Sequence, residues 1–409
     1  GVVAMVLEYE QGILFEPESS TAKSFSCSSC GLYDHVKSPR MEPYGKFRKG
    51  ILNIGEAPGE VEDNRGKPWQ GRAGQVLHRV YREVGIDLFE DCLNVNAVSC
   101  RPTSKTGSNR TPTDKEIQAC RGNVFRVIKE YKPKVVVLFG GVALQSVIGN
   151  YWKKNLGEIS RWHGFVIPDR NVGAWVIPTF HPSYIMRQER SEEYRLVWKQ
   201  DVKKVIDVLD NPLPAYKEQV HVVNDEEHAK EVLRMFLDRK PKFLYVDIET
   251  TGLKPYNRDS HKIICMSLCD NENESWVIPM PQDVTLLKRL LEHPKIGKLA
   301  HNMKFENNWL SVLCGIDVQP WVWDSMIAAH VLDNRPDITG LKFQVYVNFG
   351  VADYDSEIEQ YLKADGSNSV NKILDLWRSL SGRNKLMTYC GLDSLFGYRL
   401  AMNQMGLMT

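Results

Sequence analysis

Apolar and polar positions alternate with two different periods along the first half of the chain. Short apolar runs are typical of buried strands, and they cover residues 51–54, 93–99, 134–140 and 174–180. Amphipathic stretches with helical spacing lie between and after them, at residues 73–84, 114–131 and 191–209. Strands that alternate with helices favour a parallel sheet covered on both faces. We therefore predict an α/β domain with three layers, helix on sheet on helix.

A second domain is predicted after residue 218. Residues 210–216 hold two prolines after a helical stretch, and a new strand-like run starts at residues 219–223. The predicted division is an N-terminal strap over the first domain, the first domain, a linker and a second domain, at residues 1–24, 25–209, 210–218 and 219–409.

The loop that follows the first strand has an unusual composition. The run at residues 51–54 ends in Gly-Glu-Ala-Pro-Gly at residues 55–59. Glycines at a strand end allow backbone amides to approach a ligand closely. The loop also carries charged and aromatic side chains at Glu56, Glu62 and Trp69. We interpret it as a ligand-binding loop at the carboxyl edge of a parallel sheet.

Composition excludes several classes of protein. Hydrophobic residues make up 43% and charged residues 25% of the 409 residues, as in ordinary globular proteins. The formal net charge is only +1, so any surface for nucleic acid must be a local one. No apolar run approaches the roughly 20 residues of a membrane span. Nine cysteines in a chain of this length suggest no disulfide framework and favour a cytoplasmic protein.

Four of the cysteines are candidates for a metal site. Cys27 and Cys30 form a Cys-x-x-Cys pair, which alone is equally compatible with zinc, redox chemistry or chance. Cys100 lies at the end of a predicted strand and Cys120 lies in a predicted helix. Four thiolates from such elements can surround zinc or an iron–sulfur cluster, and the spacing does not choose between them.

A carboxylate pair marks the second domain. Asp247 lies in the apolar run 243–248 and Glu249 follows two residues later, so both side chains lie on the same face of the predicted strand. Burying such a pair is costly unless a cation neutralises it. Oxygen ligands at this density suit Mg²⁺ or Mn²⁺.

The first domain resembles family 4 uracil-DNA glycosylases. The motifs that carry the resemblance extend over about residues 25–208, at residues 55–59, 62–63, 66–69, 71–74, 96–102, 110–113 and 181–184. The resemblance implies a uracil-DNA glycosylase-like fold that excises uracil from DNA. It also implies a [4Fe-4S] cluster held by Cys27, Cys30, Cys100 and Cys120.

The same resemblance implies roles for single residues. Glu56 and His181 would be catalytic, His181 by donating to the carbonyl oxygen on which charge develops. The residues implied in substrate binding are Gly55, Ala57, Trp69, Asn96, Ser183 and Arg187. Trp69 stands where the family usually has phenylalanine, and Ala57 stands where other glycosylase families have aspartate. Tyr184 would follow the DNA backbone or fill the vacated stack, and Arg110 is a candidate phosphate contact.

The second domain resembles DEDD-type 3′–5′ exonucleases, which have a ribonuclease H-like fold, and among them the proofreading domains of family A DNA polymerases. The matching segments lie within about residues 219–409, at residues 247–253, 300–306, 323–326, 337–341 and 389–393. By resemblance, two Mg²⁺ or Mn²⁺ ions would be held by Asp247, Glu249, Glu306 and Asp393, and Tyr389 would orient the attacking water. Glu306 departs from the family's aspartate, and Asp324 is an alternative ligand.

Taken together, the two resemblances predict a DNA repair or replication enzyme with two hydrolytic activities. It would excise uracil and degrade DNA from 3′ ends, with single-stranded or uracil-containing DNA as its partner. One alternative is a DNA-binding module that only senses uracil. Another is a detached proofreading subunit whose partner is a separate DNA polymerase. A fusion of these two domains without a polymerase domain suggests a bacteriophage source.

Overall fold

The computed structural model describes residues 4–8, 27–188 and 191–409, which form two compact units. The N-terminal unit falls within Gln11–Pro214 and includes Tyr346–Ala352. The C-terminal unit falls within Gly1–Glu10, Ala215–Val345 and Asp353–Thr409. None of the helices in these described residues is long and apolar enough to cross a membrane.

The N-terminal unit is built on a five-stranded sheet with the order β3-β2-β4-β6-β5. Its strands are β2 (Ile51–Gly55), β3 (Cys92–Asn96), β4 (Val135–Phe139), β5 (Ile167–Asp169) and β6 (Ala174–Thr179). All neighbouring strands are parallel except β5, which pairs antiparallel with β6 at the edge. Every residue of β2 and β4 is buried, as expected of central strands covered on both faces.

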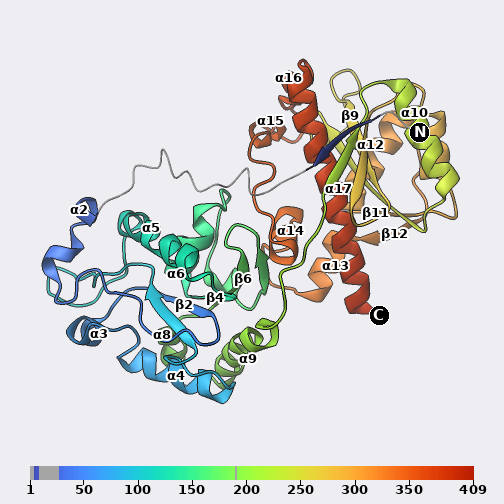
Figure 1. Cartoon of the computed structure of the whole chain (residues 1–409). Coiled ribbons are helices and arrows are strands. Elements are labelled where there is room, and N and C mark those ends of the chain that lie inside the picture. Colours follow the sequence, from blue (N-terminus) through green and yellow to red (C-terminus); the bar gives the residue numbers. More distant parts are fainter. Residues whose placement is uncertain (1–3, 9–26, 189–190) are drawn as a thin grey trace. The chain divides into compact units, whose positions relative to one another are not determined.

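Helices cover both faces of this sheet. Figure 1 shows α5 and α6 on one side, with α4, α8 and α9 on the other. The helices of this unit are α2 (Cys27–Cys30), α3 (Glu60–Arg65), α4 (Arg72–Glu83), α5 (Asp114–Tyr131), α6 (Gly141–Val147), α7 (Ile159–Trp162), α8 (Pro182–Arg187) and α9 (Glu192–Val208), with 3-10 turns at Leu32–His35 and Ile148–Asn150. The predicted three-layer α/β/α arrangement is therefore confirmed.

The C-terminal unit has a seven-stranded mixed sheet with the order β1-β7-β10-β9-β8-β11-β12. Its strands are β1 (Met5–Glu8), β7 (Gln219–Val222), β8 (Phe243–Thr250), β9 (Ile263–Cys269), β10 (Glu274–Pro279), β11 (Gly297–Ala300) and β12 (Trp321–Asp324). β8 lies near the middle, antiparallel to β9 and parallel to β11. Asp247 and Glu249 are therefore on a well-supported strand.

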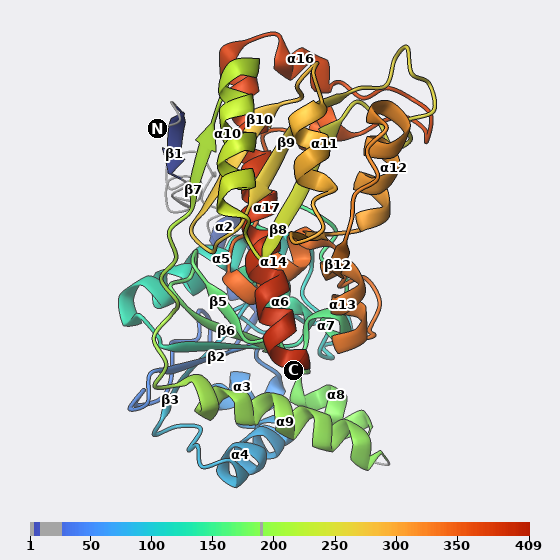
Figure 2. The same ribbon diagram turned by 90° about the vertical axis from the view of Figure 1, so that its right-hand side faces the viewer.

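The long helix α17 lies along this sheet (Figure 2). Two close approaches require glycine: a Cβ on Gly397 would lie 2.2 Å from Cζ of Tyr245, and one on Gly391 would lie 2.3 Å from a methyl carbon of Val220. The helices of this unit are α10 (Glu226–Arg239), α11 (Thr285–Leu291), α12 (Met303–Cys314), α13 (Ser325–Leu332), α15 (Glu359–Leu362), α16 (Ile373–Trp377) and α17 (Leu380–Met408), together with the first residues of α14 (Leu341–Phe349), whose later residues are counted in the N-terminal unit.

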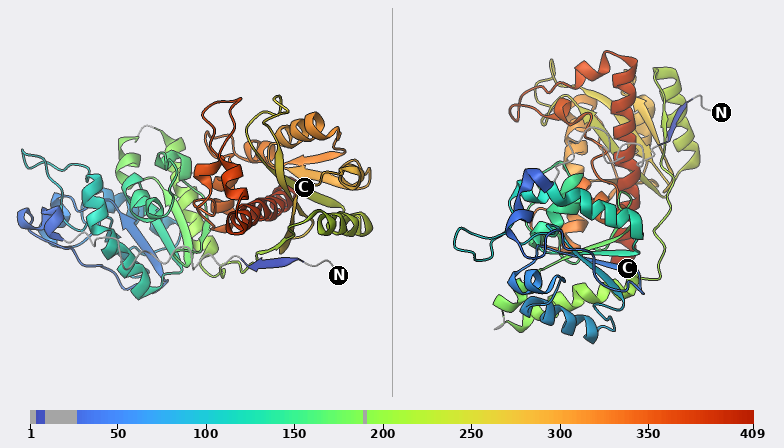
Figure 3. Two further views of the ribbon diagram at one scale, coloured as in Figure 1. Left: turned by 90° about the horizontal axis from the view of Figure 1, so that it is seen from above. Right: turned by 60° about the vertical axis from the view of Figure 1, so that its left-hand side comes forward.

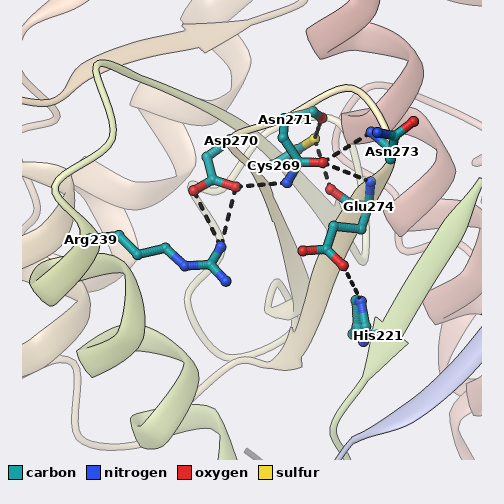
Figure 4. Close-up of polar contacts among 7 residues, drawn as sticks. All are labelled: His221, Arg239, Cys269, Asp270, Asn271, Asn273 and Glu274. Atoms are coloured by element: carbon teal, nitrogen blue, oxygen red, sulfur yellow. Dashed lines mark hydrogen bonds and ion pairs between the residues drawn. The ribbon is translucent and has the colours of Figure 1, made fainter.

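The turn between β9 and β10 is closed by side chains rather than by sheet pairing alone (Figure 4). Asn271 Oδ1 accepts hydrogen bonds from the backbone N–H groups of Asn273 and Glu274, at 3.0 and 3.1 Å. The Glu274 carboxylate lies 2.8 Å from Nε2 of His221 on the neighbouring strand β7. These contacts fix the register of β10 against β7 without using any predicted site residue.

The first residues of the chain differ from the expected strap over the first domain. Met5–Glu8 form β1, which pairs antiparallel with β7 and extends the sheet of the C-terminal unit (Figure 3). An exposed strand edge readily accepts a further strand, which explains this pairing. The rest of the expected strap, residues 9–24, lies outside the described residues.

Candidate functional sites

Three predicted site residues come from different strands to one edge of the N-terminal sheet. β2 ends at Gly55, β3 ends at Asn96, and His181 follows β6 as the N-cap residue of α8. The carboxyl ends of parallel strands meet at the same edge, where open α/β sheets bind their ligands. The structure thus brings together segments that are up to 126 residues apart in the sequence.

The missing side chain of Gly55 allows this edge to close tightly. Gly55 pairs with Asn96 in the sheet register. A Cβ on Gly55 would lie 2.6 Å from Oδ1 of Asn96 and 3.0 Å from Cζ2 of Trp69. The indole of Trp69 is 8% exposed, and its Nε1 has no hydrogen-bond partner among the described residues. Its ring centroid lies 5.6 Å from that of His181. The amide of Asn96, the indole of Trp69 and the imidazole of His181 therefore lie close together at this edge.

The acidic residues of the loop after β2 hold its backbone. The carboxylate of Glu62 accepts from three backbone N–H groups, those of Gly59, Gln70 and Gly71, at 3.1, 3.0 and 2.5 Å. Asp63 is buried and accepts from the N–H groups of residues 37–38. Hydrogen bonds from several amides to one carboxylate are strong, because they are charge-assisted. Glu62 and Asp63 thus fix the loop that carries Glu56 and Trp69.

His181 is held as a neutral hydrogen-bond donor. The backbone N–H of Ser183 donates to Nδ1 of His181 at 3.1 Å, and the Ser183 hydroxyl lies 2.7 Å from the same atom. Burial, with a smaller contribution from Arg187, lowers the pKa of His181 to about 4. Because Nδ1 accepts from the backbone, the single proton of the neutral ring resides on Nε2. Nε2 can therefore donate without carrying a full charge.

Burial also shifts the pKa of Glu56, but in the opposite direction from that of His181. Burial raises the pKa of Glu56 above its usual value, and the positive charge of Arg187 partly offsets this increase. Arg187 is the last residue of α8, so the helix that His181 begins also brings the arginine to the site. Tyr184, on the same helix, stacks on Phe180 with ring centroids 5.2 Å apart. Its ring is thus already packed against the unit.

The four predicted cysteine ligands surround one cavity. Cys27 and Cys30 come from α2, Cys100 from the segment after β3, and Cys120 from α5. Burial raises the pKa of the Cys120 thiol to about 11 and also raises that of Cys100. The backbone N–H of Arg40 donates to the Cys100 sulfur at 3.2 Å. To ionise to thiolates, these cysteines would therefore need a cationic partner.

Asp247 and Glu249 lie on β8 with the thiol of Cys390 beside them. One ligand atom from each of these residues lies within 4.8 Å of the other two. Burial raises the pKa of Asp247 and of Glu249 well above the usual range, and Asp393 and Asp247 respectively raise it further. Cys390, on α17, lies 3.6 Å from Oδ2 of Asp247. This is a desolvated cluster with too little positive charge.

Glu306 and the alternative ligand Asp324 differ in their hydrogen bonding. Asp324 caps α13 and accepts backbone N–H groups from Asn302, Met303 and Met326, each at 3.0 Å. Glu306, on α12, is 3% exposed, and its Oε2 has no hydrogen-bond partner among the described residues. Burial, then Asp247, raises the pKa of Glu306 well above its usual value. The free buried oxygen of Glu306 is thus available to a cation, whereas Asp324 is engaged by the backbone.

Asp393 and Tyr389 share a partner that the sequence did not indicate. The ammonium group of Lys342 donates to Oδ1 of Asp393 and to Oη of Tyr389, both at 2.7 Å. The hydroxyl of Tyr354 also donates to Oδ1 of Asp393, at 2.6 Å. Burial alone would lower the pKa of Lys342, but Asp393 and Asp355 outweigh it and raise that pKa. A lysine thus supplies one of the positive charges that the cluster lacks.

Comparison with known proteins identifies a family for each half of the chain. Residues 42–203 match the family model of the uracil DNA glycosylase superfamily, and residues 220–406 match that of the 3′-5′ exonuclease. A type-4 uracil-DNA glycosylase of Thermotoga maritima is 37% identical over 196 residues, which cover 48% of this chain and 95% of that protein.

The chain belongs to the type-4 uracil-DNA glycosylase family. Its second half carries a 3′-5′ exonuclease domain related to those of DNA polymerases of the A type. The expected glycosylase-like and ribonuclease H-like folds are therefore confirmed. We call the two units the glycosylase unit and the exonuclease unit.

Two further relatives concern the exonuclease. A DNA polymerase of Bacillus phage SP01 is 22% identical over 327 residues, covering 72% of this chain and 34% of that polymerase. Escherichia coli RNase D, an exoribonuclease involved in structured RNA processing, has a TM-score of 0.34 at 17% identity, covering 47% of this chain and 44% of RNase D. The polymerase alignment is longer than either family match, so it extends into both units.

Arg110, which is expected to contact a phosphate, also has partners within the protein. Its guanidinium group makes two hydrogen bonds to the Glu116 carboxylate, at 2.9 and 2.6 Å, and a third to the carbonyl oxygen of Thr103. Glu116 in turn caps α5 together with Thr113. Arg110 therefore stabilises the start of α5. The capping pattern from Thr113 to Glu116 was visible in the sequence, but the choice of Arg110 as its partner was not.

Replacing Gly55 with alanine should abolish uracil excision without affecting the exonuclease. The added Cβ would overlap Asn96 and Trp69, and a displacement of about 1 Å in an active site can cost about a hundredfold in rate. Excision from a uracil-containing oligonucleotide measures the loss. Gly122→Ala is the matched control, since a Cβ there meets nothing within 4 Å. Normal excision by Gly55→Ala would show that the space at Gly55 is not the uracil site.

Glu306→Gln should lose exonuclease activity but not stability, whereas Asp324→Ala should lose stability. Glu306→Gln should lower 3′–5′ degradation by at least about a hundredfold, as loss of a ligand does, while the unfolding temperature is kept or raised because a buried charge is gone. Asp324→Ala should lower the free energy of unfolding by at least about 1 kcal/mol through the lost cap. Degradation assays and thermal melts of both variants test this. An active Glu306→Gln variant would contradict the assignment.

Proposed function

We propose that this chain is a bifunctional DNA hydrolase that excises uracil and also degrades DNA from its 3′ ends. The observation that carries the first activity is the meeting of Asn96, Trp69 and His181 at the edge beside Gly55, in a chain of the type-4 family. The observation that carries the second is the buried carboxylate cluster on β8, within a 3′-5′ exonuclease domain.

The proposed uracil pocket uses neutral donors and stacking. The amide of Asn96 offers both a donor and an acceptor to the edge of a flipped base. The indole of Trp69 would stack on the ring and limit the space for the methyl group of thymine. Nε2–H of His181 would donate to the carbonyl oxygen where negative charge develops as the N-glycosidic bond breaks. Its lowered pKa supports this role, because a neutral donor is maintained at neutral pH.

The remaining residues of the pocket have supporting roles in this proposal. Glu56 would stabilise the positively charged sugar or hold the attacking water, and its charge is partly maintained by Arg187. Ser183 fixes the tautomer of His181 through its backbone N–H and hydroxyl groups. Ala57 packs near the cysteine cluster. Because its side chain cannot act as a base, it would contribute only its backbone groups to the pocket. Arg187 is exposed and can reach a phosphate of the bound strand.

A local positive surface supports DNA binding by a chain with almost no net charge. A hollow of about 410 Å³ beside Trp69 is lined by basic side chains, those of Arg65, His78, Arg79 and Arg82. The three arginines are exposed. Arginine side chains gathered in this way bind DNA phosphates without reading sequence.

The cysteine set fits an iron–sulfur cluster better than zinc. Sulfur ligands of one zinc ion lie about 3.8 Å apart, given Zn–S bonds of about 2.3 Å. Among the described residues, only Asp247, Glu249 and Cys390 have three ligand atoms within 4.8 Å of one another, so the four cysteine sulfurs are more widely spaced. A [4Fe-4S] cluster spreads its ligands over a cage of four irons. When bound, it would tie α2, the segment after β3 and α5 together.

The exonuclease site fits divalent cations. Asp247, Glu249, Glu306 and Asp393 would hold two Mg²⁺ or Mn²⁺ ions, and the unpartnered Oε2 of Glu306 supports its inclusion. When bound, such ions activate water and stabilise the leaving 3′ oxygen. Burial raises the pKa of Tyr389 well above its usual range, so its hydroxyl keeps its proton and can orient the water or the scissile phosphate.

A second candidate role is that of a proofreading partner for a separate DNA polymerase. The alignment with the phage SP01 DNA polymerase extends into both units but covers only 34% of that protein. In this role the glycosylase unit would bind or sense uracil in the strand being corrected. A polymerase from the same source should then retain the chain in a pull-down assay, which the free-standing repair enzyme would not require.

Chelation should separate the two proposed activities in one experiment. Excision of uracil should persist in EDTA and fall about a hundredfold in His181→Ala. Degradation from the 3′ end should stop in EDTA and in Asp247→Asn, which should excise uracil normally.

Between about pH 5 and about pH 8, titration of His181 should not change the excision rate, because its pKa is about 4. A rate that falls steadily with rising pH would instead indicate that the charged imidazolium is required.

Metal analysis should find iron and not zinc. The purified chain should contain about four irons with broad absorbance near 400 nm, and Cys100→Ser should lose most of both. Cys92 is buried in the core of the sheet, away from the cavity, so Cys92→Ala is the control that should keep the iron. Stoichiometric zinc without iron would refute the cluster.

A further inference from the structure

A largely buried lysine lies beside the proposed exonuclease metal site. Lys342 is near the start of α14, and its side chain is 19% exposed while that of Asp393 is 6% exposed. Its ammonium group contacts Asp393 and Tyr389 directly and lies 4.5 Å from the centroid of the Tyr389 ring. The roles proposed above for Asp247, Glu249, Glu306, Asp393 and Tyr389 do not involve Lys342.

The contacts of Lys342 determine the direction of two hydrogen bonds. An ammonium group has only donors, so Oη of Tyr389 must accept from it. The proton of the Tyr389 hydroxyl is then directed away from Lys342 and remains available to a water or a phosphate oxygen. At Asp393, Oδ1 already accepts from both Lys342 and Tyr354. A divalent ion that binds this oxygen must compete with the ammonium group.

We propose that Lys342 is a positioning residue of the exonuclease that weakens metal binding and, in exchange, orients Tyr389 for the reaction. This inference rests on the proposed metal site at Asp247, Glu249, Glu306 and Asp393. A positive charge beside a carboxylate ligand repels an incoming divalent ion. The same charge keeps the lone pair of Tyr389 occupied, and it adds electrostatic stabilisation where negative charge gathers on the scissile phosphate.

The proposal makes metal affinity and turnover change in opposite directions. Without the charge of Lys342, the carboxylate cluster should bind Mn²⁺ at least about tenfold more tightly, by the Coulomb energy of a unit charge at this range. At saturating Mn²⁺, kcat should nevertheless fall about a hundredfold, because Tyr389 loses the donor that orients it. A lysine that only supported the fold would, on removal, weaken Mn²⁺ binding and lower kcat together.

The test is Mn²⁺ titration of the full chain, read by the EPR signal of free Mn²⁺, together with kcat for 3′–5′ degradation at saturating Mn²⁺. The variants are Lys342→Met and Lys342→Gln, of which the second still donates a hydrogen bond and keeps the site folded if methionine does not. Lys385→Met is the matched control. Lys385 lies one turn before Tyr389 on α17, where it pairs with Glu357 at 3.4 Å on the surface, so its loss should change neither quantity.

Asp247→Asn identifies which Mn²⁺ ions belong to the site, and it separates two kinds of failure. If Asp247→Asn leaves Mn²⁺ binding unchanged, the proposed metal site itself is wrong. If it removes the binding and the Lys342 variants bind Mn²⁺ no more tightly than the wild type, the metal site stands and the role of Lys342 is overturned. Tighter binding with unchanged kcat would also overturn it, because Tyr389 would not depend on Lys342.

Discussion

Repulsion among the carboxylates on and around β8 is the constraint on which the exonuclease unit depends. Asp247, Glu249 and Glu306 are desolvated, and burial raises the pKa of each well above its usual value. Such a cluster tends to become neutral unless cations enter it. The elements around the cluster are held in place by the fold. β8 is central in its sheet, and α17 is packed closely through Gly391 and Gly397. Asp324 joins α12 to α13 through its hydrogen bonds to their backbone N–H groups.

The glycosylase unit solves the problem of buried polar groups in a different way. Its site has a histidine that burial keeps neutral and a glutamate whose carboxylate is only partly compensated by Arg187. Few full charges need to be neutralised there, so the mechanism proposed above relies on hydrogen bonds and stacking. What it requires instead is space, which the absent side chain of Gly55 provides. Of the acidic residues of the loop, Glu62 accepts from the backbone of the loop itself and Asp63 accepts from the backbone of residues 37–38.

These two strategies explain why one chain can hold both chemistries. Uracil excision needs a snug, uncharged pocket that recognises a base. Phosphodiester hydrolysis needs a concentration of negative charge that attracts divalent ions. Each set of residues is supported by the sheet of its own unit. The iron–sulfur cluster proposed for the glycosylase unit would be structural, because its cysteines would join α2, α5 and the segment after β3.

The sequence alone determined the class of the fold and the order of the motifs, and it supplied the residues expected to carry chemistry. Residue types at fixed spacing identify these features, as at Gly55–Gly59 in one half and at Asp247 and Glu249 in the other. The sequence also predicted the helix at Asp114–Tyr131, whose capping residues are local. Local periodicity and spacing depend on neighbours in the chain, so they can be read without coordinates.

Only the tertiary structure decided which partner each of these side chains meets. Lys342 reaches Asp393 across 51 residues, and Asp324 reaches Asn302 across 22 residues. Arg110 binds Glu116, and Met5–Glu8 extend a sheet whose other strands start after residue 218. The physical reason is that hydrogen bonds and ion pairs depend on distance in space, and a spacing in the sequence does not encode which distant segments the packing of the sheet and helices brings within 3 Å.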